Sequence, residues 1–253
     1  MRRIQLIVEY DGTNYAGWQR QANALAVQQV IEEKLERLIG APVVIHGASR
    51  TDAGVHALGQ SVHFDTESRI PGEKFSYALN TMLPHDIRVS LSEDAPPDFH
   101  ARFSTKGKRY RYLFWDARHA GALNRLTHAH SIYPLDDLLM QAEANALIGT
   151  HDFAAFAASG SVVKDTVRTI WRADVTRDGD EVKLIVEGSG FLYNMVRIIA
   201  GTLRDIGSGK LAPGALKKAI DTGDRLDLGV TAPAHGLTLM EVFYELPKEA
   251  RKP

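Results

Sequence analysis

The strongest constraint on the fold is the order in which strand-like and helical segments follow one another. In the first half, residues 4–10 alternate apolar and polar side chains as a strand does, and an apolar stripe from Val27 to Leu38 indicates a helix that ends at Gly40. This half is completed by short strands at 43–46, 61–64 and 87–91 and a short helix at 74–81.

The second half mixes strands and helices in the same way. A hairpin over 167–186 is predicted to turn at Asp178-Gly179-Asp180, because glycine between polar residues favours a tight turn. The remaining segments are strands at 108–115 and 239–246 and helices at 135–147, 191–206 and 214–220, the last with Pro213 at its first position. Hairpins together with helices predict an α+β fold with a mostly antiparallel sheet rather than a doubly wound fold.

The proline-containing stretch 94–98 has the composition of a loop and marks a boundary, so we predict two domains, residues 1–103 and 104–253. A chain of 253 residues is long enough for two compact cores. No apolar run reaches the roughly 18 residues of a transmembrane helix, and the first residues become charged too soon for a signal peptide. The sequence therefore predicts a cytoplasmic protein that does not enter a membrane.

Missing residue types and motifs argue against several kinds of chemistry. The chain has no cysteine, which excludes disulfides, thiolate metal sites and cysteine nucleophiles. The P-loop, the dinucleotide fingerprint, the G-x-S-x-G elbow and the H-E-x-x-H pair do not occur. The 10 histidines are better explained as core or surface residues than as metal ligands. We expect no metal and no cofactor.

A local charge pattern points towards RNA although the total charge does not. Basic residues number 30 against 31 acidic ones, for a formal net charge of −1. Binding depends on local patches, however, and the run K-G-K-R-Y-R-Y at 106–112 is both basic and aromatic. A second basic stretch lies at 164–177.

One octapeptide, S-R-T-D-A-G-V-H at 49–56, carries the candidate reactive group. Arg50 precedes Asp52 by two residues, and a neighbouring cation favours the ionised carboxylate. Gly54 lets the backbone turn tightly or approach a ligand. An ionised, held carboxylate can act as nucleophile, base or metal ligand. A loop salt bridge with a turn glycine would use the same residues, so the octapeptide alone leaves both readings open.

Five sequence blocks taken together closely resemble the tRNA pseudouridine synthase A family, from about residue 3 to about residue 246. The second block is highly specific, and the others gain weight from their order and spacing. The blocks are Y-D-G-T-N-Y-A-G-W-Q (10–19), R-T-D-A-G-V-H-A (50–57), K-R-Y-R-Y (108–112), G-F-L-Y-N-M-V-R (190–197) and A-P-A-H-G-L (232–237).

The resemblance implies an activity. Family members isomerise uridine to pseudouridine in the anticodon arm of tRNA, typically at positions 38, 39 and 40, without a cofactor, and they work as homodimers with tRNA spanning both subunits. The resemblance also implies two RNA-recognition-like α/β halves. Their sheets would join into one central antiparallel sheet flanked by helices, with Asp52 in the cleft between the halves.

By resemblance, Asp52 is the nucleophile, and it would attack either the ribose C1′ or the uracil C6. Arg197 is the residue that the family places against the aspartate, and Arg50 lies near the flipped nucleotide. Tyr110 would stack on the uracil or remove the C5 proton, and Leu237 would pack against the base.

The two basic stretches would then contact the RNA backbone. The residues expected to do so are Lys106, Lys108, Arg109, Arg111, Lys164 and Arg168. Three other functions stay open. The chain could be an RNA-binding module without catalysis, a metal-dependent hydrolase that uses Asp52 with His56 and His63, or a related synthase that acts on another RNA position.

Overall fold

The computed structural model describes residues 1–158, 165–246 and 250. The chain divides into two compact units. Unit 1 comprises Met1–Lys106 and Thr238–Glu245, and unit 2 comprises Gly107–Leu237 with Leu246. The first unit is therefore built from both ends of the chain.

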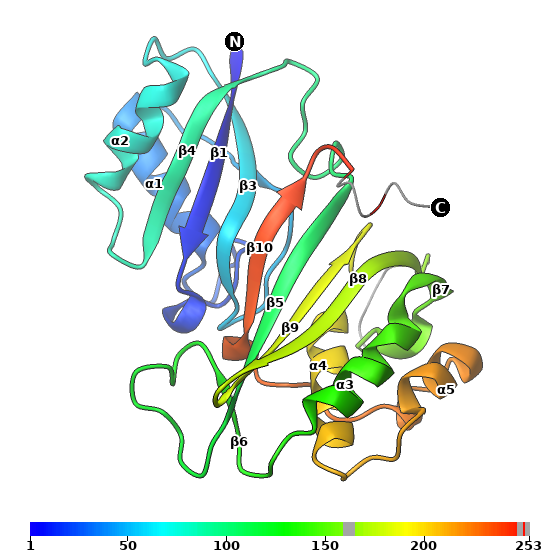
Figure 1. Cartoon of the computed structure of the whole chain (residues 1–253). Helices are drawn as coiled ribbons and strands as arrows, with labels where there is room; N and C mark the ends of the chain where they lie inside the picture. Colours follow the sequence, from blue (N-terminus) through cyan, green and yellow to red (C-terminus); the bar gives the residue numbers. More distant parts are fainter. Residues whose placement is uncertain (159–164, 247–249, 251–253) are drawn as a thin grey trace. The chain divides into compact units, whose positions relative to one another are not determined.

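Unit 1 is a small sheet with helices (Figure 1). Its strands follow the order β4-β1-β3-β10, and β2 pairs with β3. The strands are β1 (Arg2–Tyr10), β2 (His46–Gly47), β3 (His56–Thr66), β4 (Ile87–Ala95) and β10 (Leu237–Phe243). The helices are α1 (Val27–Ile39) and α2 (Phe75–Asn80), with single 3₁₀ turns at Gly12–Asn14 and Gly72–Lys74.

The alternation predicted for the first strand sets the core of unit 1. Ile4, Leu6 and Val8 of β1 are fully buried. The amphipathic helix α1 turns an apolar stripe inwards and ends at Gly40, whose φ of 80° is a left-handed conformation that favours glycine. Central β1 pairs antiparallel with both β3 and β4.

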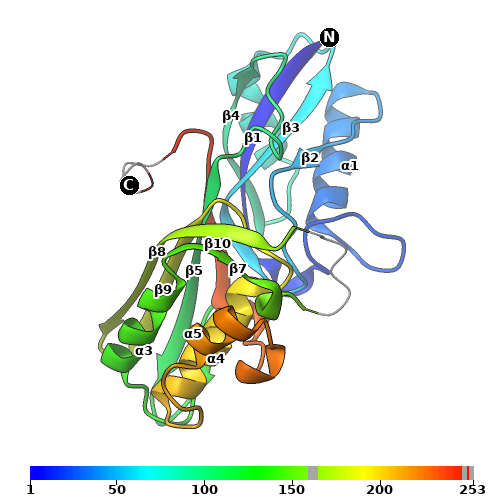
Figure 2. The same cartoon turned by 90° about the vertical axis from the view of Figure 1, so that its right-hand side faces the viewer.

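Unit 2 packs three helices together with a second set of strands (Figure 2). The strand order is β5-β9-β8-β7, and β6 pairs with β5. The strands are β5 (Gly107–Asp116), β6 (Ala129–Ser131), β7 (Gly149–Asp152), β8 (Val167–Asp178) and β9 (Glu181–Gly188). The helices are α3 (Asp137–Ala144), α4 (Met195–Gly207) and α5 (Ala215–Thr222), with 3₁₀ turns at Asn145–Leu147, Ala154–Phe156, Arg225–Asp227 and Ala234–Gly236.

The α+β class is confirmed, and so is the hairpin, whose Gly179 has a φ of 56°. The pairing is mixed rather than purely antiparallel. β10 runs parallel to β3, with Thr238 opposite His56, and β6 runs parallel to β5. Such pairings join segments that are remote or irregularly connected in sequence, and local periodicity carries no sign of them.

Three predicted boundaries are wrong for identifiable reasons. The strand expected at 43–46 is replaced by the short strand His46–Gly47. The backbone of Ile45 is bonded by side chains of α1 instead of by a neighbouring strand. The Glu32 carboxylate accepts from its N–H at 3.2 Å, and Gln28 donates to its C=O at 3.1 Å. Helix α4 begins at Met195 rather than at 191, since Asn194 has a φ of 61°. Pro213 precedes the cap of α5, which is Gly214.

A cluster of three histidine rings lies on unit 1. His63 of β3 is buried, with ring centroids 5.1 Å from His46 and 4.6 Å from His100. Its Nδ1 accepts from the backbone N–H of Ala101 at 3.1 Å. Burial, followed by the positive charges of His100, Arg3 and His46, lowers the pKa of His63 to about 4, while nearby Asp65 acts in the opposite sense.

Unit 1 is therefore expected to lose stability in mild acid. The folded-state pKa lies below the ordinary 6.5, so between these two pKa values unfolding takes up a proton. The contribution of neutral His63 to the free energy of unfolding is therefore complete above pH 6.5 and is lost as the pH falls towards 4. The loss should reach roughly 2–3 kcal/mol. Urea unfolding at several pH values measures it, with His63→Asn as control, because the amide oxygen accepts the same bond without titrating. Equal pH slopes for both proteins would contradict this assignment.

Candidate active site

Asp52 lies on a short turn in unit 1, between β2 and the start of β3. Its backbone C=O accepts a hydrogen bond from the N–H of Val55 at 3.1 Å. Gly54, at the third position of this turn, has a φ of 76°, which strongly favours glycine. Asp52 itself is half-buried. The glycine two residues after the aspartate thus sets the turn that displays the carboxylate.

The segment that follows β1 holds this turn from one side. The hydroxyls of Tyr10 and Thr51 are 2.7 Å apart and both residues are buried. The backbone N–H of Trp18 donates to the C=O of Thr51 at 3.0 Å, and the N–H of Gly54 donates to the C=O of Tyr15 at 3.3 Å. The first two sequence blocks therefore meet, and the residue before Asp52 is fixed by two bonds.

Two glycines of the first block permit this close approach. A Cβ at Gly12 would lie 2.0 Å from the carbonyl oxygen of Val55, and one at Gly17 would lie 2.4 Å from that of Thr51. Gly17 also has a φ of 89°. No larger residue fits at either place without moving the backbone beside Asp52.

Gln60 holds the start of the same loop and was missed by the sequence reasoning. Its side chain is 0% exposed, its Oε1 accepts from the N–H of Ser49 at 3.2 Å, and its Nε2 donates to the C=O of Ser49 at 2.6 Å. A buried amide needs such partners. The available signal is a glutamine next to the predicted strand at 61–64, close in sequence to the Asp52 segment. His56 adds a further anchor, its Nδ1 accepting from the N–H of Gly12 at 3.0 Å.

Arg50 differs from its neighbours. It is exposed, and in the part of the chain that the structure describes it makes no hydrogen bond or ion pair. A solvated guanidinium beside a rigid turn can move to meet a phosphate or to enter a space that a base has left.

Tyr110 and Arg197 belong to unit 2. Tyr110 of β5 is buried, and its ring meets Phe191 edge to face, with centroids 5.2 Å apart. Arg197 of α4 is half-buried; its Nε donates to the C=O of Ala232 at 2.9 Å and its Nη1 to the Oδ1 of Asn194 at 2.9 Å. The N–H of Ala232 returns a bond to the C=O of Arg197 at 3.0 Å. The two side-chain bonds fix the plane of the guanidinium.

The conformation of Asn194 supports this arrangement. Among the described residues it is the only non-glycine with a positive φ, 61°. Asparagine tolerates this left-handed region better than most residues. Its carbonyl accepts from Ile198 to begin α4 while its amide oxygen reaches Arg197.

The segment that ends at Leu237 is fixed by a buried tyrosine. Tyr112 donates its hydroxyl to the C=O of Pro233 at 2.8 Å, and burial raises the pKa of this phenol well above its usual value. Gly236 lies against the same ring, where a Cβ would come within 2.5 Å of Cζ. Leu237 follows as a buried residue. Unit 2 thus carries Tyr110, Arg197 and Leu237, and unit 1 carries Asp52 and Arg50.

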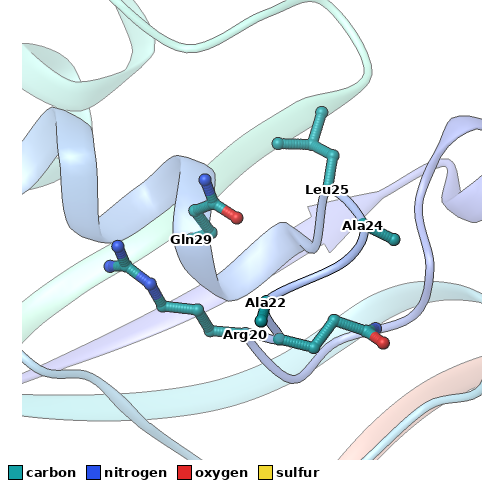
Figure 3. A pocket seen from close by; sticks show the side chains of 6 residues that line it. Arg20, Ala22, Ala24, Leu25 and Gln29 are labelled. Atoms are coloured by element: carbon teal, nitrogen blue, oxygen red, sulfur yellow. The ribbon is translucent and has the colours of Figure 1, made fainter.

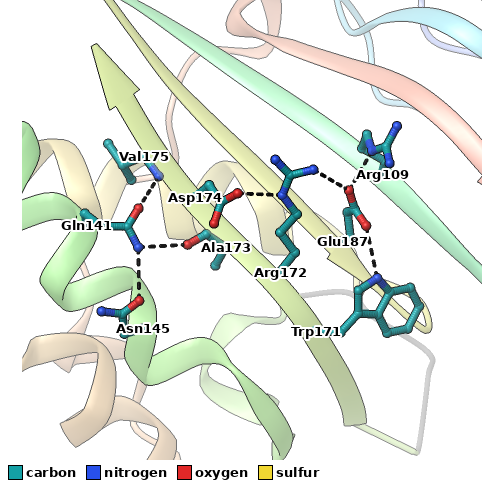
Figure 4. Close-up of polar contacts among 9 residues, drawn as sticks. All are labelled: Arg109, Gln141, Asn145, Trp171, Arg172, Ala173, Asp174, Val175 and Glu187. Atoms are coloured by element: carbon teal, nitrogen blue, oxygen red, sulfur yellow. Dashed lines mark hydrogen bonds and ion pairs between the residues drawn. The ribbon is translucent and has the colours of Figure 1, made fainter. Parts of the chain in front are cut away.

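The basic residues expected to contact RNA differ in their surroundings. Arg109 pairs at 2.7 Å with Glu187, a carboxylate that is 1% exposed and that also binds Arg172 at 3.0 Å and the indole N–H of Trp171 at 3.2 Å (Figure 4). Arg172 further pairs with Asp174 at 2.5 Å. The charge of Arg109 is therefore already shared with a buried anion.

The described residues among the other members of that group differ in their exposure. Lys106 is exposed, whereas Lys108, Arg111 and Arg168 are half-buried. Arg168 donates to the backbone carbonyls of Asp165 and Val167. Lys164 lies outside the described residues.

A cavity of about 610 Å³ lies where the chain enters α1 (Figure 3). Its lining is Arg20, Gln21, Ala22, Ala24, Leu25 and Gln29. None of these residues is among the predicted site residues. Arg20 is held at 3.0 Å by the buried carboxylate of Glu32.

Two further observations concern the described residues alone. Within residues 1–158, 165–246 and 250, no group of three or more histidine, aspartate or glutamate side chains is placed to hold a metal ion. No helix in the same ranges has the length and apolar character needed to span a membrane.

The chain matches one family of known proteins over most of its length. A family model described as tRNA pseudouridine synthase matches residues 6–104 and 144–245. The tRNA pseudouridine synthase A of Acetivibrio thermocellus is 51% identical over 96% of this chain and 100% of its own length, and that of Ruminiclostridium cellulolyticum is 50% identical with the same coverage. A chain of a solved Cbf5–Nop10–Gar1 complex aligns with a TM-score of 0.35 and 11% identity, over 79% of this chain and 53% of that one.

The chain belongs to the tRNA pseudouridine synthase A family, and it is a pseudouridine-forming isomerase.

Proposed function

We propose that the enzyme converts uridine to pseudouridine at positions 38, 39 and 40 in the anticodon arm of tRNA, with Asp52 as the nucleophile. The observation that carries this proposal is the turn around Asp52. Its flanking residues are tied to the first sequence block by the Tyr10–Thr51 hydroxyl pair and by the Trp18 N–H. A turn held in this way suits a carboxylate that must be positioned against one atom of a flipped nucleotide.

The reaction needs no oxidant or energy source. Asp52 attacks C1′ of the ribose or C6 of the uracil, and the N1–C1′ bond breaks. The uracil turns, a bond forms between C5 and C1′, and the carboxylate is released. C5 then loses its proton and N1 gains one, so atoms and electrons balance.

The remaining residues take supporting roles in this proposal. In this proposal Arg197 supplies the positive charge that, by the family resemblance, balances the Asp52 carboxylate. Tyr110 stacks on the uracil or accepts the C5 proton, and Leu237 packs against the base. Arg50 occupies the space or holds the phosphate at the flipped nucleotide, since extruding a base costs a few kcal/mol. The homodimer implied by the family resemblance and the cytoplasmic location predicted from the sequence complete the proposal.

Release of tritium from uracil C5 tests this function. The substrates are unmodified tRNA transcripts labelled at C5, together with variants in which uridine is kept at only one of positions 38, 39 and 40. Release should occur at each position and persist in EDTA. Release from other uridines alone would favour a related synthase, loss in EDTA would favour a metal-dependent enzyme, and salt-sensitive binding without release would favour an RNA-binding module.

The amide oxygen of Asn194 is expected to orient the Arg197 guanidinium. Asn194→Gly keeps access to the left-handed conformation but removes the amide acceptor, whereas Asn194→Ala removes the acceptor and adds backbone strain of about 1 kcal/mol. Both variants should lower kcat by about tenfold, as expected for one lost orienting bond. Only the alanine variant should also lower Tm. Wild-type kcat in Asn194→Gly would show that the amide does not orient the guanidinium.

A further inference from the structure

Phe103 of unit 1 is an exposed aromatic residue on a turn that the proposed chemistry does not use. Its side chain is 77% exposed. It lies in the run H-A-R-F-S-T-K at 100–106, which contains three basic residues, His100, Arg102 and Lys106, and no acidic residue. Single exposed apolar residues are common, so the surroundings of Phe103 decide whether it has a role.

The turn is tied internally at several points. The Nδ1 of His100 accepts from the N–H groups of Arg102 at 3.1 Å and Phe103 at 3.3 Å. The N–H of His100 donates to the hydroxyl of Ser104 at 3.0 Å, and the N–H of Ser104 donates back to the C=O of His100 at 2.9 Å. The hydroxyl of Thr105 donates to the C=O of Ala101 at 2.8 Å.

The same turn is anchored to the body of unit 1. Tyr244 donates its hydroxyl to the C=O of Ala101 at 2.9 Å, and the N–H of Lys106 donates to the C=O of Phe243 at 2.7 Å. The N–H of Ala101 donates to His63. A side chain on a turn held in this way loses little conformational entropy when it binds a ligand.

Rings and cations surround Phe103 on one side. The His100 ring lies 4.3 Å from it between centroids, at 37°, and His100 is in turn 4.6 Å from His63. The Arg102 guanidinium carbon lies 5.8 Å from the Phe103 centroid. Arg102 and Lys106 are exposed. Phe103 therefore ends a row of rings in edge-on and tilted contact, and the Arg102 cation lies beside it.

We propose that Phe103, with Arg102 and Lys106, forms a second RNA contact that stacks one unpaired base of tRNA and binds its phosphate. Rigid exposed aromatics next to cations bind single-stranded nucleic acid in this way, because every base has a face to stack and a phosphate beside it. The contact is distinct in role from the groups that act on the isomerised uridine. It rests on the proposed function only in taking tRNA as the partner.

Binding of tRNA by full-length variants tests the contact. Phe103→Ala should raise the Kd for unmodified tRNA by about 5- to 100-fold. The slope of log K against log salt should stay unchanged, whereas Lys106→Ala should reduce that slope by about one. Phe103→Trp should keep the affinity, and its added fluorescence should be quenched by tRNA.

A matched control is available on α2. Tyr77 is 70% exposed and also has a cation over its ring, Lys74 at 5.3 Å, but among the described residues no second ring stacks on it. Tyr77→Ala should leave Kd unchanged. An unchanged Kd in Phe103→Ala, or an equal effect in Tyr77→Ala, would overturn the proposal. So would a change of oligomeric state in Phe103→Ala with unaltered RNA affinity, which would assign Phe103 to a contact with a second copy of the chain.

Tritium release by the wild type separates this result from the proposed function. If the wild type releases tritium and Phe103→Ala binds tRNA normally, the second contact alone is wrong. If Phe103→Ala weakens tRNA binding but the wild type releases no tritium, the contact stands and the isomerase proposal at positions 38–40 fails.

Discussion

Replacing Asp52 by Asn is expected to abolish pseudouridine formation, with a loss of kcat of at least about 10⁴-fold, as for other covalent nucleophiles. The amide is nearly the same size and keeps the backbone turn, in which the C=O of Asp52 accepts from Val55. It cannot, however, form the covalent bond to the nucleoside. Tritium release from C5 and thermal unfolding, measured on the same preparation, should show inactive protein with a Tm close to that of the wild type.

Two further variants make this result specific. Asp52→Glu keeps a carboxylate but moves it by one methylene, so it should also lose most of its activity if position matters. Glu67→Gln removes an exposed acidic charge elsewhere in unit 1 and should leave kcat unchanged. Activity above a tenth of the wild-type value in Asp52→Asn would remove Asp52 from the role of nucleophile.

Gly201→Ala is expected to destabilise the protein by about 3 kcal/mol, although a glycine-to-alanine change inside a helix usually stabilises it. In a helix interior, alanine is normally better than glycine by up to about 1 kcal/mol. At this place in α4, however, a Cβ would lie 1.8 Å from the carbonyl oxygen of Val230 and 3.0 Å from the backbone N of Ala232. Backbone cannot give way as a side chain can, so the neighbouring segment must move. Because Ala232 orients Arg197, kcat should fall as well.

Gly207→Ala in the same helix is the matched control. There a Cβ would meet the Cγ and Sδ of Met140 at 2.7 Å, and an unbranched methionine side chain can change rotamer more readily than backbone can move. Its effect on the free energy of urea unfolding should stay within about 1 kcal/mol. Equal stabilities for the two variants, or a Gly201→Ala protein as stable as the wild type, would contradict the packing described for α4 and residues 230–232.

The parts of the fold that local pattern determines could be predicted from the sequence. The first strand, helix α1 with Gly40 and the hairpin at Gly179 follow from periodicity and turn chemistry. β3 was predicted only at 61–64 although it spans His56–Thr66, because it is buried on both sides and does not alternate. Its polar residues Gln60 and His63 have partners that are supplied by tertiary structure.

The candidate site shows the same division. The sequence directs attention to Asp52 because an arginine, an aspartate and a glycine are close together in it. It could not show that Thr51 is fixed by Tyr10 or that Arg197 is oriented by Ala232, since these partners are 41 and 35 residues away. Nor could it distinguish Arg109, which shares the buried Glu187, from the exposed Lys106.

The return of β10 to unit 1 has a consequence for how the enzyme is made on the ribosome. Residues 1–106 leave the ribosome early, but β10, which pairs with β3 just after the Asp52 turn, starts at Leu237. At about 5–20 residues per second, the missing strand follows roughly ten seconds later. During that interval the part of the β3 edge at His56 and Ala57, which β10 later pairs, is an open template for pairing with other nascent chains. Chaperone demand and aggregation during synthesis should therefore depend on translation speed through unit 2.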